Sequence, residues 1–167
     1  RDDIFDSCIA LHTENKLKYN VELNKDSLRE RIENIASSTR MTRALLLLYA
    51  YLDENQTKLI SNIFDIEHIF PKKWQNTNYN GWEKEEAQLY LDKLGNKTIF
   101  EKKLNIQAGN QYFAQKKLKY AESEISIVQK LSKYPKSDWI KEDIEERQKE
   151  VINKLLSFFE NELVLKQ

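Results

Sequence analysis

The helical pattern that runs through most of this chain breaks at residues 63–70, and this break limits the folds open to it. The segment is rich in β-branched and aromatic residues and is followed at once by Pro71. Such residues favour extended backbone, and a proline disfavours helix at the residue before it. We therefore expect a short strand or extended loop at this point.

A second β-branched and aromatic segment, residues 97–100, follows the first. Between the two lie a loop-like stretch at 75–81 and a helical pattern at 82–93, in which Leu89 and Trp82 are expected to face inward. The pair Gly95 and Asn96 then supplies a helix C-cap. After the second segment, a further helix is expected to open within residues 105–110 and to run through Lys119.

The first 60 residues favour helices. Ser27 and Glu30 have the spacing of a capping box, and Ser38 or Thr39 can cap an apolar helix from Met41 to about Glu54.

Beyond Asp138, apolar residues recur close to the helical period of 3.6, which predicts one long amphipathic helix that packs across the first helices. These residues are Ile140, Ile144, Val151, Ile152, Leu155, Leu156, Phe159, Leu163 and Val164.

Only three glycines and two prolines occur among the 167 residues, and 40% of the residues are apolar. That balance is typical of a helix-rich globular chain about the size of one domain. We expect a mostly helical α+β fold with a small ββα core, a hairpin followed by a helix, embedded between terminal helices. The expected parts of this single domain are a helical scaffold (1–60), the core (61–120) and the C-terminal helices (121–167).

The cysteine content and the chain start favour a cytoplasmic fragment of a longer protein. No signal peptide opens the chain, and it begins at Arg1 without an initiator Met. Cys8 is the sole cysteine, which excludes an internal disulfide or a multi-cysteine zinc site, so a metal would need oxygen or imidazole ligands. The apolar run at 44–52 is far shorter than the roughly 20 residues that cross a bilayer, so no membrane segment is expected.

Charge is balanced in total but not in distribution. Lys plus Arg and Asp plus Glu each number 27, which argues against a protein that coats nucleic acid by bulk charge. Residues 93–119, however, contain seven lysines against Glu101, a net charge of +6. Residues 138–162 carry a net charge of −4. Each run by itself is equally well explained as a solvated helix face.

The two histidines lie in different surroundings. His12 lies in a helical stretch and is interpreted as an ordinary structural histidine. His68 follows Glu67 directly and lies three residues before Pro71. A neutral imidazole can take a proton from water near neutral pH, and an adjacent carboxylate can hold a divalent cation. Phosphodiester hydrolysis needs both, although an isolated acid-His pair is more often structural.

Asparagines downstream extend the pattern and give it the order of a known family. The chain resembles the HNH (His-Me finger) nuclease domain found at the C-terminus of GmrSD-type modification-dependent restriction enzymes. The resemblance covers mainly residues 63–120. The matching motifs are Glu67-His68-Ile69-Phe70-Pro71, Leu94-Gly95-Asn96, Leu104-Asn105, and Phe113 with Lys116.

The resemblance implies a role for each matching residue. His68 would be the general base, while Glu67 and Asn105 would bind a divalent cation, Mg²⁺ or Mn²⁺. Asn96 would brace the hairpin and its base. Lys116 would lie near the scissile phosphate, with Lys117 beside it as the alternative.

Two features depart from the expected pattern. Lys97 stands where such domains usually continue with apolar residues. In addition, adjacent residues of a regular strand point to opposite faces, so Glu67 and His68 cannot share one side of a flat strand. Either the backbone leaves regular geometry there, or the phosphate is reached from two directions.

Other side chains could contact nucleic acid. Lys102, Lys103 and Lys117 would hold DNA phosphates without reading sequence. Polar residues nearby could contact phosphate but more often cap a helix, and aromatic residues could stack on bases but are more often anchors of the core or of a loop. They are Gln107, Asn110, Gln111, Trp74, Tyr79 and Trp82.

We interpret the chain as a metal-dependent endonuclease that hydrolyses DNA phosphodiesters in defence against foreign or modified DNA. The resemblance also implies an N-terminal nucleotide-hydrolysing portion of the same protein. The alternative is an inactive helical module that binds nucleic acid or protein and keeps the HNH-like residues as structural remnants. The neutral total charge favours that second hypothesis.

Overall fold

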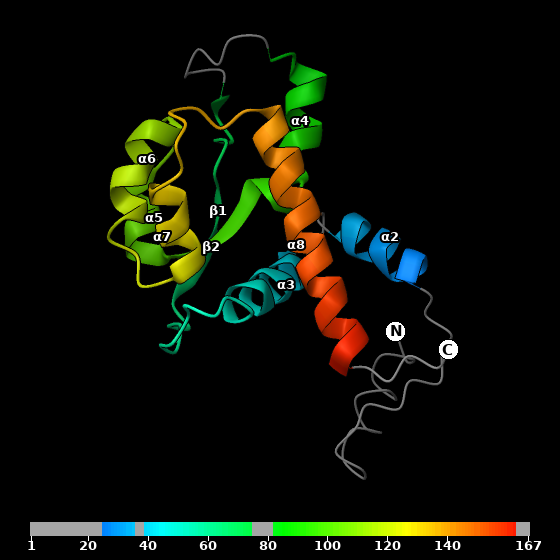
Figure 1. The fold of residues 1–167 in the computed structure, drawn as a ribbon. Helices are drawn as coiled ribbons and strands as arrows, with labels where there is room; N and C mark the ends of the chain where they lie inside the picture. The colour runs from blue at the N-terminus through cyan, green and yellow to red at the C-terminus, as the bar shows by residue number, and fades with distance from the viewer. Residues whose placement is uncertain (1–24, 36–38, 75–81, 163–167) are drawn as a thin grey trace.

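In the computed structural model, residues 25–35, 39–74 and 82–162 are described. The described part is a mostly helical α+β structure with one two-stranded antiparallel hairpin (Figure 1). In chain order, the elements are α2 (Lys25–Ile35), α3 (Thr39–Tyr51), β1 (Phe64–His68), α4 (Lys84–Asp92), the 3-10 turn η3 (Leu94–Asn96), β2 (Lys97–Glu101), α5 (Lys102–Ala108), α6 (Phe113–Tyr120), α7 (Ser126–Ser132) and α8 (Lys141–Glu162).

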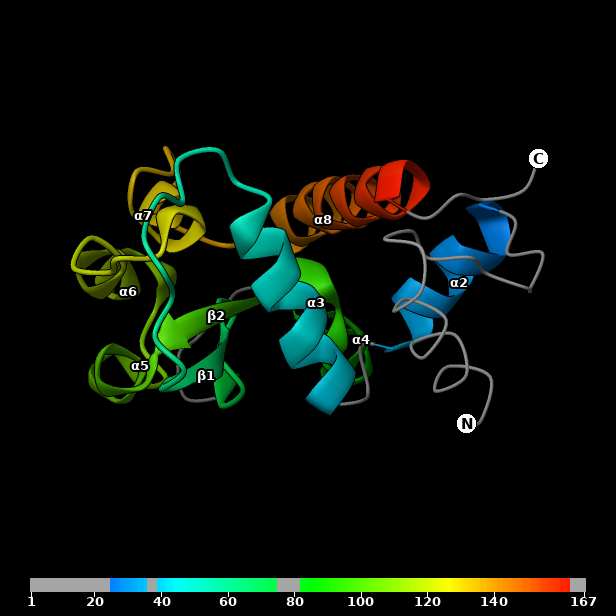
Figure 2. The same ribbon diagram turned by 90° about the horizontal axis from the view of Figure 1, so that it is seen from below.

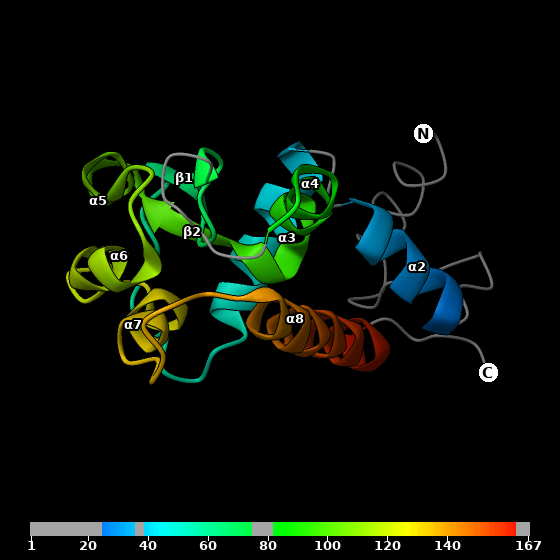
Figure 3. The same ribbon diagram turned by 90° about the horizontal axis from the view of Figure 1, so that it is seen from above.

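The hairpin lies between two groups of helices. Helices α5, α6 and α7 flank it on one side, while α3, α4 and α8 lie on the other (Figures 2 and 3). The register pairs Phe64 with Glu101 at one end and His68 with Lys97 at the other. The His68 end of β1 therefore lies beside the start of β2, where the chain leaves η3.

The long helix α8 forms because its apolar residues recur on one face. Ile144, Val151, Ile152, Leu155 and Leu156 are all buried, and their spacing places them on one helical stripe. This stripe packs against α3, α2 and η3, which confirms the expected packing across the first helices. Each such side chain contributes roughly 1.5–3 kcal/mol of burial free energy.

A glycine allows α8 to approach the turn before β2. A Cβ on Gly95 would lie 2.1 Å from the Ile144 carbonyl oxygen and 2.7 Å from the Gln148 amide nitrogen. The amide of Gly95 also donates to Gln148 Oε1 at 2.6 Å. The backbone of η3 is thereby held directly on α8.

Several boundaries differ from those expected. The helix expected through Lys119 is two helices, because Gly109 ends α5 with a positive φ of 55°. Helix α2 begins at Lys25, so Ser27 lies inside it and the capping box is wrong. Leu89 is 69% exposed rather than inward-facing, whereas Trp82 is buried as expected.

Some residues named in the sequence analysis lie outside the described residues. They are Cys8, His12, Ser38, Tyr79, Leu163 and Val164.

In the described ranges, no helix is both long and apolar enough to cross a membrane.

We predict that Gly95→Ala destabilises the protein, because the added methyl would have to push α8 away from the turn. Overpacking of this kind typically costs about 1–3 kcal/mol. Chemical denaturation should show a lower midpoint for this variant than for Ala114→Ser, a conservative change at an exposed position of α6. Equal midpoints for the two variants would contradict the close packing of η3 on α8.

Candidate active site

One open cavity of about 230 Å³ lies at the His68 end of β1. It is formed by the end of β1, the segment that follows it, α5 with the turn after it, and α6. Three of the predicted metal and catalytic residues from distant parts of the sequence, Glu67, Asn105 and Lys116, line it together with His68. The remaining lining residues are Ile66, Pro71, Lys72, Gly109 and Asn110.

Asn96 holds the segment after β1 in place from the neighbouring turn. Its Oδ1 accepts a hydrogen bond from the Phe70 amide at 2.7 Å, and its Nδ2 donates to the Phe70 carbonyl at 3.2 Å. Its own carbonyl accepts from the Ile69 amide at 2.9 Å. Because Asn96 is fully buried, these bonds are protected from water. The Asn96 side chain thus binds the main chain of Phe70, and it does not line the cavity.

Glu67 is buried and already has two partners. Its Oε1 accepts a hydrogen bond from the Tyr120 hydroxyl at 2.9 Å and forms an ion pair with Lys116 Nζ at 2.7 Å. Both partners are on α6. Since Glu67 is only 5% exposed, a carboxylate here needs such partners to offset its lost hydration.

Lys116 reaches β1 through the protein interior. It is 1% exposed, and its ammonium also donates to the His68 carbonyl at 2.6 Å and to the Ile69 carbonyl at 3.4 Å. Burial lowers the pKa of Lys116, while the Glu67 carboxylate opposes that shift. The ammonium therefore holds together the strand end and the carboxylate of Glu67.

The imidazole of His68 is surrounded by cations. Its pKa is lowered to about 3, mainly by burial, and the charges of Lys72, Lys97 and Lys116 act in the same direction, while Asp92 opposes them. Lys97 is the cross-strand neighbour of His68, is 5% exposed, and pairs with Asp92 at 3.3 Å. The imidazole is consequently neutral at pH 7, the state that can accept a proton.

Both Glu67 and His68 line the cavity although they are adjacent in a strand. Glu67 pairs with Thr98 and His68 with Lys97 across the regular hairpin, which ends at His68. The Glu67 side chain contacts α6, whereas the cations around His68 include Lys97 and Lys72, from β2 and the segment after Pro71. The strand is therefore regular at Glu67 and His68, so the alternative of irregular backbone is wrong. Access of a phosphate from two directions stays a prediction.

The other predicted residues differ in whether they reach the cavity. Asn105 lies in the middle of α5 and lines the cavity, and Lys102 and Lys103 are exposed at the start of that helix. Lys117 points elsewhere, because its ammonium donates to the carbonyls of Tyr134 and Lys136. Lys117 is therefore not brought to the cavity with Lys116.

Two residues of the site were missed in the sequence. Tyr120 lies four residues after Lys116, and residues at that spacing share one face of a helix. This spacing is a signal that could have found it. Lys72 follows the Glu67 to Pro71 motif directly and lines the cavity, but the sequence around it does not distinguish it from Lys73.

The sequence matches the family model of the GmrSD restriction endonucleases, C-terminal domain, over residues 17–154. That match spans most of the chain. The chain belongs to this family of restriction endonuclease domains. Neither a curated protein nor a solved structure gives a match. The GmrSD match includes every residue to which the motif assigned a role, from Glu67 to Lys117.

The oxygen donors of this GmrSD-type domain fit a hard divalent cation. The Glu67 carboxylate and the Asn105 amide line one cavity, and oxygen ligands of these kinds suit Mg²⁺, which usually keeps several waters. In the described ranges, no group of three or more His, Cys, Asp or Glu side chains is placed to hold a metal. A cation held by Glu67 and Asn105 would have to share Glu67 with Lys116.

We predict that Lys116→Met destabilises the domain by about 3–5 kcal/mol, because it leaves Glu67 buried without its counter-charge. Equilibrium unfolding in urea should reveal the loss. Lys119→Met is the matched control on the same helix, since its ion pair with Glu122 is more exposed and contributes only tenths of a kcal/mol. A Lys116→Met variant as stable as the control would contradict the buried pair.

Proposed function

We propose that this domain is a metal-dependent endonuclease that hydrolyses DNA phosphodiester bonds. The observation that supports this most is the convergence of Glu67, His68 and Asn105 on one open cavity. Glu67 and His68 lie on β1, and Asn105 lies on α5, the helix that follows β2. The family match to restriction endonuclease domains supports the same reaction.

His68 would act as the general base. Its neutral imidazole would take the proton of the attacking water while the phosphodiester lies in the cavity. Asn96 would keep the backbone after His68 in position through Phe70. A phosphate bound in the cavity beside Lys72 would offset the charge of that lysine. The pKa of the imidazole would then rise, which would make it a stronger base.

A divalent cation held by Glu67 and Asn105 would neutralise the charge that develops on the phosphate and on the leaving oxygen. For that cation to bind, the Lys116 ammonium would shift along Glu67 or away from it. Lys116 would then be free to contact the phosphate, as the family resemblance implies. Tyr120 would keep Glu67 oriented throughout, because its hydroxyl bonds the same oxygen.

Exposed lysines would hold the DNA backbone. Lys102 and Lys103 project from the start of α5, the helix that carries Asn105. Lys72 lies at the cavity itself. Contacts of this kind fix the position of a duplex without reading its sequence. Lys117 would contribute less than first predicted, since its ammonium is engaged with backbone carbonyls.

In the cell, this domain would act in the cytoplasm against foreign or modified DNA. It would work with an N-terminal nucleotide-hydrolysing portion of the same protein that licenses cleavage. The second hypothesis, an inactive binding module, is favoured by the ion pair that occupies Glu67. The two are distinguished by the following experiments.

We predict that His68→Ala lowers cleavage of supercoiled plasmid by about 10²–10⁴-fold, the usual contribution of a general base. His12→Ala is the matched control, as it removes the other histidine of the chain and should cleave like the wild type. Circular dichroism should show that both variants are folded. Undiminished cleavage by folded His68→Ala would remove the base assignment.

We predict that Mn²⁺ binds the wild-type domain and that Glu67→Gln and Asn105→Ala each weaken binding by at least tenfold. Isothermal titration calorimetry measures this without relying on activity. The control is Glu54→Gln, which changes an exposed acid after α3. Absence of Mn²⁺ and Mg²⁺ binding to the folded wild type would favour the binding module over the nuclease.

A further inference from the structure

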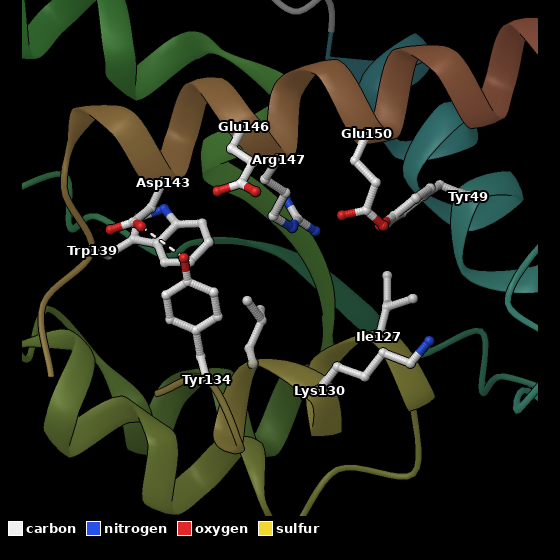
Figure 4. Close-up of a pocket in the computed structure, with 10 residues that line it drawn as sticks. Tyr49, Ile127, Lys130, Tyr134, Trp139, Asp143, Glu146, Arg147 and Glu150 are labelled. Carbon is white, nitrogen blue, oxygen red and sulfur yellow. Dashed lines mark hydrogen bonds between the residues drawn. The ribbon is translucent and has the colours of Figure 1, made fainter. Parts of the chain in front are cut away.

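A second cavity of about 220 Å³ lies where α7 and the segment before α8 meet α3 and α8 (Figure 4). It shares no lining residue with the candidate active site. Its walls include the rings of Tyr49, Tyr134 and Trp139, and α8 supplies Glu146, Arg147 and Glu150. Figure 4 shows the Arg147 guanidinium directed from α8 toward the space that these side chains surround.

Arg147 is a buried cation that no carboxylate contacts directly, although the charge of Glu150 opposes the effect of burial on its pKa. It is 7% exposed, and its Nη1 donates to the carbonyls of Leu94, Gly95 and Lys97 at 3.2, 3.0 and 2.8 Å. Its Nη2 is buried without a hydrogen-bond partner. In the described part of the chain, Arg147 forms no ion pair with a carboxylate. A buried guanidinium in this state favours an incoming acceptor, best of all an anionic one.

A second donor on the same cavity wall is also unpaired. Trp139 is 2% exposed, and its Nε1 has no hydrogen-bond partner. Its ring is fixed by contacts with Phe113 and Tyr134, at centroid distances of 5.2 and 5.1 Å. Buried indole N–H groups usually find a partner. Two residues that line this cavity, Arg147 and Trp139, therefore each carry a buried donor without a partner.

The acidic residues of the cavity disfavour a ligand that carries only negative charge. Glu146 and Glu150 flank Arg147 on α8 and are exposed at the mouth of the cavity. Asp143 also lines it, but Lys136 and the Tyr134 hydroxyl already bind its carboxylate. A lone carboxylate that approached Arg147 would be repelled by the two glutamates, whereas a protonated amine would be attracted.

From these groups, we propose that the cavity binds a small zwitterion with a carboxylate for Arg147 and a protonated amine for Glu146 and Glu150, the chemistry of an amino acid. Lys130 also lines the cavity, but its ammonium pairs with Asp53, as Asp143 pairs with Lys136. The charges that remain are two acids and one arginine, which favours a molecule with a second amine. The volume is below the roughly 300–1,000 Å³ of pockets for drug-sized ligands, which suits a compact molecule. The proposal does not depend on nuclease activity.

Binding at this cavity should be visible at the backbone of η3. Arg147 holds the Leu94, Gly95 and Lys97 carbonyls with one nitrogen and would hold the ligand with the other. A carboxylate on Nη2 would polarise the guanidinium and alter those bonds. The amide signals of Gly95 and Lys97 are therefore natural reporters.

The experiment is a titration of L-lysine into the full chain, followed by calorimetry and by amide NMR shifts. L-Lysine should bind saturably. Acetate, which has only the carboxylate, and butylamine, which has only an amine, should bind at least tenfold more weakly. Glu146→Gln should weaken L-lysine binding at least tenfold. Glu142→Gln, an exposed acid of α8 outside the cavity lining, is the matched control and should bind like the wild type.

N-acetyl-L-lysine methylamide distinguishes a free molecule from a lysine presented by a protein chain, because it lacks the free carboxylate. Tighter binding of free L-lysine than of this amide supports the proposal, and the reverse overturns it. The proposal is also overturned if L-lysine gives no saturable response, if acetate binds as tightly, or if Glu146→Gln has no effect in a variant shown to be folded.

Discussion

The hydrogen bonds around Asn96 link the turn η3, which precedes β2, to the segment that follows β1. Asn96 binds the backbone of Phe70 with both side-chain atoms, and its carbonyl binds the Ile69 amide. From the other side, Arg147 on α8 binds the carbonyls of the same turn. Because all these groups are buried, loss of one would leave others unsatisfied. The position of the chain after His68 depends on this network.

The candidate site combines buried charge with an open cavity. Glu67 and Lys116 compensate each other in the interior, so neither can be removed alone without a large electrostatic cost. The cavity beside them is lined by Lys72 and Lys116. Burial, together with these charges and that of the cross-strand Lys97, keeps His68 neutral. Such an environment favours binding of an anion such as a phosphate. A cation bound there would compete with Lys116 for Glu67.

Local signals in the sequence predicted the segments near the site with useful accuracy. Pro71 and the β-branched residues before it placed the first strand within two residues of its observed ends. The expected C-cap at Gly95 and Asn96 was wrong, because Lys93 is the C-cap of α4 and these two residues form η3. Signals that depend on packing gave mixed results, since the apolar face of α8 and Trp82 are buried as expected but other positions are not. Leu89 is apolar but exposed, and the helix expected through Lys119 is divided after Gly109. Periodicity alone does not show which face of a short helix is covered.

The sequence by itself determined the mainly helical composition, the two extended segments that form the hairpin, and the order of Glu67, His68, Asn96 and Asn105 on which the family resemblance rests. Tertiary structure alone decided that Lys116 is buried on Glu67 while Lys117 binds carbonyls elsewhere. It also decided that Lys97 is a buried neighbour of His68 and that Arg147 has one unpaired nitrogen. The reason is physical: chain order fixes which groups are present, whereas burial and partners depend on contacts between residues far apart in the sequence.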